Sequence, residues 1–128
     1  MRITQINREI TQITEQIIGC CFKVHSELGP GFKEKIYHNA LKIVLEEEEL
    51  KYKTEKVFNV NINGKKVGSL KLDLIVEDKV IVEVKAVVGY VPDVFKYQVL
   101  SYLKVSGLHV GLLVNFGNKS CQIKRFIY

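Results

Sequence analysis

The chain has 128 residues, of which 47% are hydrophobic and 26% are charged. A chain of this length can bury one core without disulfides or a structural metal, so we expect a single domain over residues 1–128 and no separate regulatory domain. The net charge of +5 mildly favours a polyanionic partner such as nucleic acid, through neutralisation of phosphates.

The cysteines and the apolar segments bear on the cell compartment. Cys20, Cys21 and Cys121 contain no Cys-x-x-Cys spacing and are odd in number, so we expect reduced thiols. The first residues interrupt apolar positions with polar ones, and no apolar run approaches the ~20 residues that cross a bilayer. We therefore expect a cytoplasmic protein without a membrane partner.

Two helices are predicted first along the chain. Residues 4–27 repeat apolar side chains at intervals of three and four, which is typical of an amphipathic helix. The segment Gly29-Pro30-Gly31 ends it, because glycine suits a left-handed cap and proline cannot continue a helix. A second helix is predicted over residues 32–49, and one of its faces carries Ile36, Tyr37, Ala40, Leu41 and Val44.

The pattern then changes to the period of two that is typical of strands. Residues 57–62 alternate, and Asn63-Gly64 is a strong hairpin turn signal because both residues tolerate positive φ. A second strand is predicted over residues 66–76, with alternating Leu70, Leu72, Leu74 and Val76, and a third over residues 80–87 after a turn at 77–79.

The remaining elements complete an α/β pattern. A helix is predicted to start with Asp93 as its N-cap and to end at Gly107, and strands follow over residues 109–116 and 120–127. The order is α-α-β-β-β-α-β-β. A helix between the third and fourth strands permits parallel pairing, so we expect a mixed sheet with helices packed on it.

Charged residues interrupt two of the predicted strands. Glu83 and Lys85 lie on one face of an otherwise apolar strand, and burying them is costly unless they are paired or bind something. A turn near Asp78 pairs residues whose numbers sum to about 156, which places Asp73 opposite Glu83. A hard divalent ion such as Mg²⁺ or Mn²⁺ would relieve the repulsion between these carboxylates. The spacing leaves open a buried ion pair of Lys85 with no metal.

The same residues resemble a known family. Asp73 followed by Glu83-Val84-Lys85 is similar to the Asp…Glu-x-Lys motif of the PD-(D/E)XK nuclease superfamily. Residues 98–102 resemble the Gln-x-x-x-Tyr motif of its exonuclease-like branch. Residues 31–37, Gly-Phe-Lys-Glu-Lys-Ile-Tyr, resemble the motif that names the GxxExxY proteins, as do residues 24–31 and 112–116. The resemblance implies a restriction-endonuclease-like core.

The resemblance also implies roles for individual residues. Asp73, Glu83 and the carbonyl of Val84 would bind the metal, and Glu34 would add a carboxylate directly or through water. Lys85 would orient or deprotonate the attacking water, or stabilise charge on the phosphate. The implied reaction is hydrolysis of DNA or RNA phosphodiesters with Mg²⁺ or Mn²⁺. Catalytic Gln98 and the supporting Tyr102 would position the metal site or the phosphate, and Tyr37 is a further supporting residue.

Structural alternatives accompany these roles. Glu34 would also suit a helix N-terminus, and Tyr37 lies on an apolar stripe that favours the core. Gln98 and Tyr102 would also form a hydrogen-bonded pair on a helix surface. One position departs from the family pattern, in which a histidine often stands three residues before the glutamine, because this chain has Phe95 there.

Three interpretations of the whole protein therefore stay open. The first is a metal-dependent nuclease, and the second is a non-catalytic nucleic-acid-binding or assembly module that retains the fold. The third is a small α/β protein whose charged cluster only ties strands together. His38 and His109 have no recognisable metal-binding spacing, so we do not expect them to be ligands. A chain of 128 residues would need a second copy to span a duplex, which makes a homodimer an option.

Overall fold

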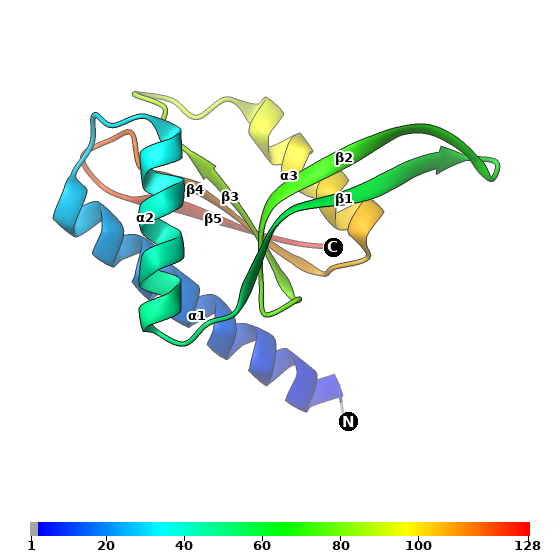
Figure 1. Ribbon diagram of the computed structural model, residues 1–128, viewed down its shortest axis with the longest axis horizontal. Coiled ribbons are helices and arrows are strands. Elements are labelled where there is room, and N and C mark those ends of the chain that lie inside the picture. Colours follow the sequence, from blue (N-terminus) through cyan, green and yellow to red (C-terminus); the bar gives the residue numbers. More distant parts are fainter. Residues whose placement is uncertain (1–2) are drawn as a thin grey trace.

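The computed structural model describes residues 3–128, with side chains from residue 7 onward. Three helices and five strands follow one another in the predicted order (Figure 1). They are α1 (Ile3–Leu28), α2 (Glu34–Glu47), β1 (Tyr52–Ile62), β2 (Lys65–Val76), β3 (Val80–Lys85), α3 (Asp93–Ser106), β4 (Val110–Asn115) and β5 (Gln122–Ile127).

The five strands form one mixed sheet in the order β1-β2-β3-β4-β5. β3 and β4 are parallel, and every other neighbouring pair is antiparallel. The parallel pair is joined through α3, as expected when a helix crosses between two strands. The predicted mixed α/β sheet is thus confirmed.

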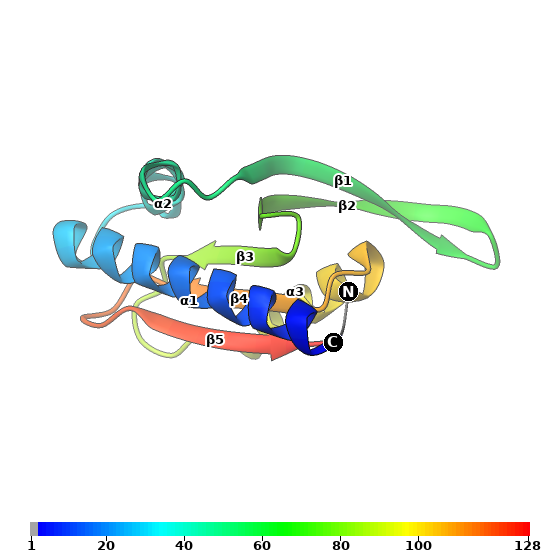
Figure 2. The ribbon, with the colours of Figure 1, turned by 90° about the horizontal axis from the view of Figure 1, so that it is seen from below.

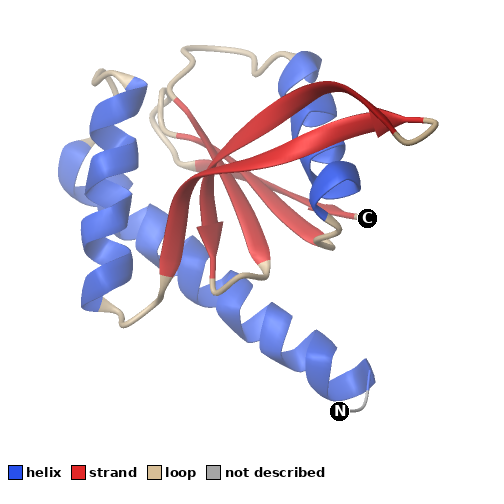
Figure 3. Cartoon of the chain, turned by 45° about the vertical axis from the view of Figure 1, so that its right-hand side comes forward, coloured by secondary structure: helices blue, strands red, loops and turns tan. Residues whose placement is uncertain are grey.

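Helices cover both faces of the sheet (Figure 3). On one face, α1 and α2 pack on side chains from all three central strands, and the largest buried group there is Tyr37. On the other face, α3 places Val99 and Leu103 against Ile81 and Leu113. Successive β3 residues alternate between these two cores, which leaves Glu83 and Lys85 on the α3 face.

The chain turns where the sequence predicts it. Gly29 has a φ of 68°, and its N–H donates to the carbonyl of His25 at 2.8 Å. Asn63 and Gly64 both have positive φ, and Gly107 caps α3 in the left-handed conformation. The prediction for Asp93 is wrong: Pro92 is the N-cap, and Asp93 is the first helical residue. Its carboxylate accepts a hydrogen bond from Tyr90 instead.

The β1–β2 ribbon is longer than predicted, because β1 begins at Tyr52 and not at residue 57. The ladder is interrupted where Glu55 faces Asp73, and Glu55 has a φ of 57°. Leu74 therefore packs in the α1/α2 core and Leu72 in the α3 core, although a regular strand would put both on one face. Beyond this point the ribbon projects past the rest of the sheet (Figure 2).

β2 and β3 separate soon after their turn. The only paired residues are Ile75 with Ile81 and Val76 with Val80. The predicted register, in which paired numbers sum to 156, is confirmed by both pairs. Past them the two strands diverge, and the fork between them opens beside Asp73 and Glu83.

Two further features concern the cysteines and the lengths of the helices. The three cysteines are free, and burial raises the pKa of Cys121 to about 11, so this thiol stays protonated at neutral pH. Within residues 3–128, no helix combines the length and the apolar character needed to cross a bilayer.

Candidate active site

Lys85 lies at the centre of a charged cluster on the α3 face of the sheet. Its Nζ is 3.4 Å from Oε1 of Glu83 and 3.9 Å from Oε1 of Glu34. The same Nζ lies 4.3 Å from the ring centroid of Phe95 on α3, within the range of a cation–π contact. Side chains from α2, β3 and α3 thus meet at one amine.

Glu83 is the most buried acid of this cluster, at 4% exposure. Burial raises the pKa of Glu83 because the charged form loses hydration, whereas the nearby Lys85 ammonium lowers it. Asp73 and Glu34 raise the same pKa by repulsion. The effects of both acids on Glu83 indicate that the three carboxylates belong to one electrostatic cluster.

Asp73 reaches the cluster from the interrupted point of the ribbon. The prediction that it pairs directly opposite Glu83 is wrong, because the β2–β3 ladder ends at Ile75 and Ile81. The strands have already diverged at Asp73, and its side chain is exposed. Asp73 nevertheless raises the pKa of Glu83 by charge repulsion.

A hollow of about 220 Å³ lies between these elements. It is lined by Glu34 and His38 from α2, Asp73 from β2 and Val84 from β3, with Lys35 beside them. The hollow is therefore lined by three of the four predicted metal ligands, Glu34, Asp73 and Val84, whereas Glu83 and Lys85 do not line it.

His38 also lines the hollow, although its spacing gave no sign of such a role. It follows Glu34 by four residues, so both project from one face of α2. The Nε2 atom of His38 is buried and has no hydrogen-bond partner among the described residues. In the sequence, the i, i+4 relation shows that His38 shares a helix face with Glu34, but it does not show that this face lines the hollow.

Gln98 and Tyr102 approach the cluster from α3. They share a helix face with Phe95, which contacts Lys85. Burial raises the pKa of Tyr102, and the charges of Glu83 and Asp73 raise it further, so its hydroxyl remains a proton donor. Oε1 of Gln98 is buried without a partner in the described part of the chain, so the expected alternative of a hydrogen-bonded surface pair does not hold.

Tyr37 supports the site from within the core. It is fully buried and stacks on Phe116, with ring centroids 4.8 Å apart. Its hydroxyl donates to the carbonyl of Gly29 at 2.5 Å and accepts from the N–H of Phe32 at 3.2 Å. Tyr37 thus fixes the segment that leads into α2 and Glu34, and it does not contact the charged cluster directly.

Asn115 holds the loop that follows β3. Its amide accepts from the N–H of Val87 at 2.8 Å, donates to the carbonyl of Val87 at 2.9 Å, and donates to Gln122 at 3.1 Å. It is 1% exposed and pairs with Lys85 in the parallel β3–β4 ladder. The loop after Lys85 is therefore fixed to the sheet by a side chain whose role was not predicted.

The residues suit a divalent ion in type, although their spacing is not that of a bound site. Within residues 3–128, no three His, Cys, Asp or Glu side chains lie close enough to hold an ion together. Glu34 and Glu83 are instead turned toward the Lys85 amine. The carboxylates, the unpartnered Nε2 of His38 and the hollow between them supply the donors that Mg²⁺ or Mn²⁺ accepts.

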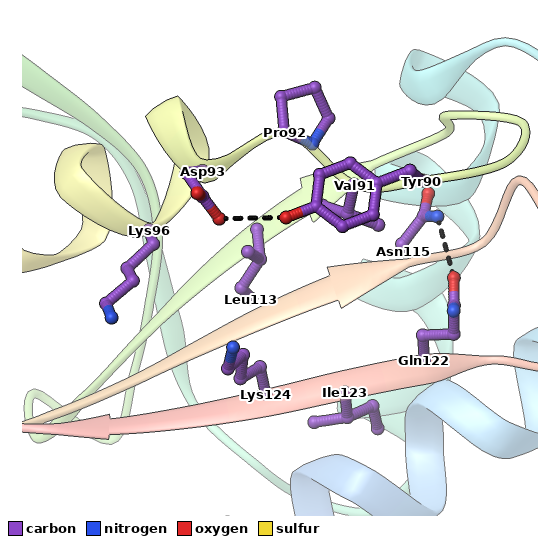
Figure 4. A pocket seen from close by; sticks show the side chains of 10 residues that line it. All are labelled: Tyr90, Val91, Pro92, Asp93, Lys96, Leu113, Asn115, Gln122, Ile123 and Lys124. Carbon is purple, nitrogen blue, oxygen red and sulfur yellow. Dashed lines mark hydrogen bonds between the residues drawn. The ribbon is translucent and has the colours of Figure 1, made fainter.

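A separate hollow of about 460 Å³ lies between the start of α3 and the β4–β5 pair. Figure 4 shows its lining, in which the hydroxyl of Tyr90 donates a hydrogen bond to the carboxylate of Asp93 and the side-chain amide of Asn115 donates one to Gln122. Asp93 is the only acid among the lining residues. Because Asp73, Glu83 and Lys85 are absent from its lining, this hollow is not part of the charged cluster.

The five-stranded mixed sheet and its three helices agree with a restriction-endonuclease-like fold. A family model described as the PD-(D/E)XK nuclease superfamily matches residues 11–126. The chain belongs to this superfamily. No curated protein and no solved structure matches the chain.

Proposed function

We propose that the protein is a divalent-metal-dependent nuclease that hydrolyses DNA or RNA phosphodiester bonds. The observation that supports this most strongly is the meeting of Glu34 and Glu83 at Lys85, beside Asp73 in the β2–β3 fork. A strand face that buries a carboxylate and an amine carries an energetic cost that catalysis explains. Membership of a nuclease superfamily supports the same reaction class.

In this proposal Asp73, Glu83 and the carbonyl of Val84 hold Mg²⁺ or Mn²⁺, and Glu34 completes the site directly or through water. A bound divalent ion lowers the pKa of water and offsets negative charge on the phosphate. The attacking water would lose one proton to solvent as its oxygen bonds to phosphorus, the bond from phosphorus to the leaving oxygen would break, and that oxygen would take up a proton from solvent.

Lys85 contributes charge and position. Its amine faces two carboxylates and an aromatic ring. We therefore assign it to the stabilisation of negative charge on the phosphate, in preference to proton removal. From the α3 side, the unpartnered Oε1 of Gln98 would accept a hydrogen bond from water, and the protonated hydroxyl of Tyr102 would donate to water or phosphate.

His38 joins the site as a positioning residue. Its unpartnered Nε2 and its place in the lining of the hollow support a contact with the ion or with a water held there.

We also propose that the protein is one of the GxxExxY proteins and works as a single domain in the cytoplasm. It would form a homodimer when it cuts both strands of a duplex.

A non-catalytic nucleic-acid-binding module is the second candidate. It is favoured by the placement of Lys85, which already neutralises Glu34 and Glu83 as a structural ion pair would. The two functions differ in their response to metal. Labelled DNA and RNA incubated with Mn²⁺ should be cut by the unaltered protein but not by Asp73→Asn or Glu83→Gln. Binding of nucleic acid without cutting at any metal concentration would favour the second candidate.

A further inference from the structure

The outer part of the β1–β2 ribbon has no role in the catalytic proposal. We define the ribbon arm as residues 56–72, which lie beyond the interruption between Glu55 and Asp73. Figures 1 and 2 show it projecting past the body of the protein. The arm begins immediately next to a predicted metal ligand, so whatever it binds comes close to the site.

The ribbon arm is uniformly basic. It contains four lysines and no aspartate or glutamate: Lys56, Lys65, Lys66 and Lys71. All four are exposed, and none of them forms an ion pair within residues 3–128. Unpaired ammonium groups gathered on one projecting element favour a polyanion.

The two faces of the arm differ. The inner face rests on α3, where Phe58 and Leu70 pack with the buried Leu72. The outer face and tip are uncovered, and Val57, Ile62 and Val67 are each more than half exposed. The inner contacts hold the arm in place, so its outer face and tip are free to meet a partner.

We propose that the ribbon arm binds duplex DNA by entering the major groove. This inference rests on the proposed action on nucleic acid. The major groove of B-DNA is about 12 Å wide and admits a two-stranded ribbon, whereas the major groove of duplex RNA is too narrow. The lysines would contact the flanking phosphates, and the exposed Asn59, Asn61 and Asn63 offer amide donors and acceptors to base edges.

The length of the arm fits one duplex. Lys65, at the tip, lies eight residue steps before Asp73 in the chain, so at about 3.3 Å per step the tip lies no more than roughly 26 Å from the base. One turn of DNA spans about 34 Å. The tip can therefore occupy a groove while the site at the base faces a phosphate within the same helical turn. Pairing between two arms is disfavoured because both carry the same charge.

The test measures binding without cutting, in EDTA, by fluorescence anisotropy of labelled duplex DNA. The variant Lys65→Ala/Lys66→Ala should bind at least about tenfold more weakly at low salt. Its slope of log Kd against log salt should fall by about 1.8, because each phosphate contact contributes about 0.9. The matched control is Lys23→Ala/Lys119→Ala, which removes two exposed lysines from α1 and the β4–β5 loop and should change affinity less than twofold.

Equal losses in both double variants would overturn the proposal, as would equally tight binding of duplex RNA or single-stranded DNA. Sedimentation gives a further outcome. If Lys65→Ala/Lys66→Ala converts a dimer to monomers but leaves DNA affinity unchanged, the arm is a contact between two copies of the chain, and the proposal is overturned. The outcome is separate from that of the nuclease proposal. If the arm binds duplex DNA in a salt-sensitive way but the protein does not cut DNA with Mn²⁺, only the nuclease proposal is contradicted. If the protein cuts DNA and the arm variants cut it equally well, only the proposal for the ribbon arm is contradicted.

Discussion

The Nζ atom of Lys85 lies 3.4 Å from Oε1 of Glu83, and both side chains project from the same face of β3. The Glu83 side chain is 6% exposed and that of Lys85 is 16% exposed. The amine thus compensates a carboxylate that has lost most of its hydration. The two residues act as one unit, so a change in either alters the state of the other.

Replacing Lys85 by methionine should destabilise the metal-free protein by about 3 kcal/mol at neutral pH, because Glu83 is left buried without a cation. Adding Mn²⁺ should restore more stability to this variant than it adds to the unaltered protein, because the freed carboxylates gain a new cation. Urea unfolding with and without Mn²⁺ measures both effects. Lys104→Met, at an exposed position on α3, is the control. An Mn²⁺ effect no larger than in the unaltered protein would contradict the metal site.

Glu83 should make stability depend on pH. Burial raises its pKa in the folded protein above the ordinary value of 4.5. At a pH between 4.5 and the raised pKa, the folded state therefore binds more protons than the unfolded state. The stability gained from this protonation is complete below pH 4.5 and is lost as the pH rises through the raised pKa. Glu83→Gln should remove that slope. Urea unfolding at a series of pH values checks this, with exposed Glu27→Gln as control. An unchanged slope would contradict the raised pKa.

The helices, the strands and the placement of Glu83 and Lys85 on one strand face followed from the sequence because local patterns determine them. The period of three to four predicted α1, and the turn at residues 77–79 correctly predicted the register of Ile75 with Ile81. The β1 start at Tyr52 was missed because its first residues, among them Lys53 and Glu55, are charged and exposed on an edge strand.

Relations that depend on three-dimensional shape were not predictable. Alternation would have placed Leu72 and Leu74 in the same core, but the interruption between Glu55 and Asp73 separates them. At the same place β2 diverges from β3, so Asp73 does not pair directly with Glu83. The alternation of side chains along a strand does not show where two paired strands, such as β2 and β3, separate. His38 was missed because only the fold shows which helix face lines the hollow.

Asn115→Ala should lower stability by about 2 kcal/mol, because the N–H and carbonyl of Val87 lose a shared partner in a part-buried place. The loop after Lys85 would loosen, so Mn²⁺ affinity should fall as well. Asn39→Ala, at an exposed position on α2, should leave both unchanged. Thermal unfolding and calorimetry give the two values. Retention of full stability would mean that Asn115 does not anchor the loop.

Tyr37→Phe should cost about 1 kcal/mol, because it removes the hydrogen bonds to Gly29 and Phe32 but keeps the ring stacked on Phe116. If the nuclease proposal is correct, the rate of cutting should fall only several-fold, against a loss of at least about 100-fold for Asp73→Asn. Comparing kcat for the two variants separates support from catalysis. A loss for Tyr37→Phe as large as that for Asp73→Asn would place Tyr37 in the catalytic machinery.

The most direct measurement is a crystal structure of the protein soaked with Mn²⁺, with the ion located by its anomalous scattering. We predict an ion in the β2–β3 fork, bound by Asp73 and Glu83 at about 2.1 Å, with Lys85 moved away from at least one carboxylate. An empty fork, with Lys85 still paired to Glu34 and Glu83 at saturating Mn²⁺, would contradict a metal-dependent nuclease and leave the cluster as an ion pair that ties the elements together.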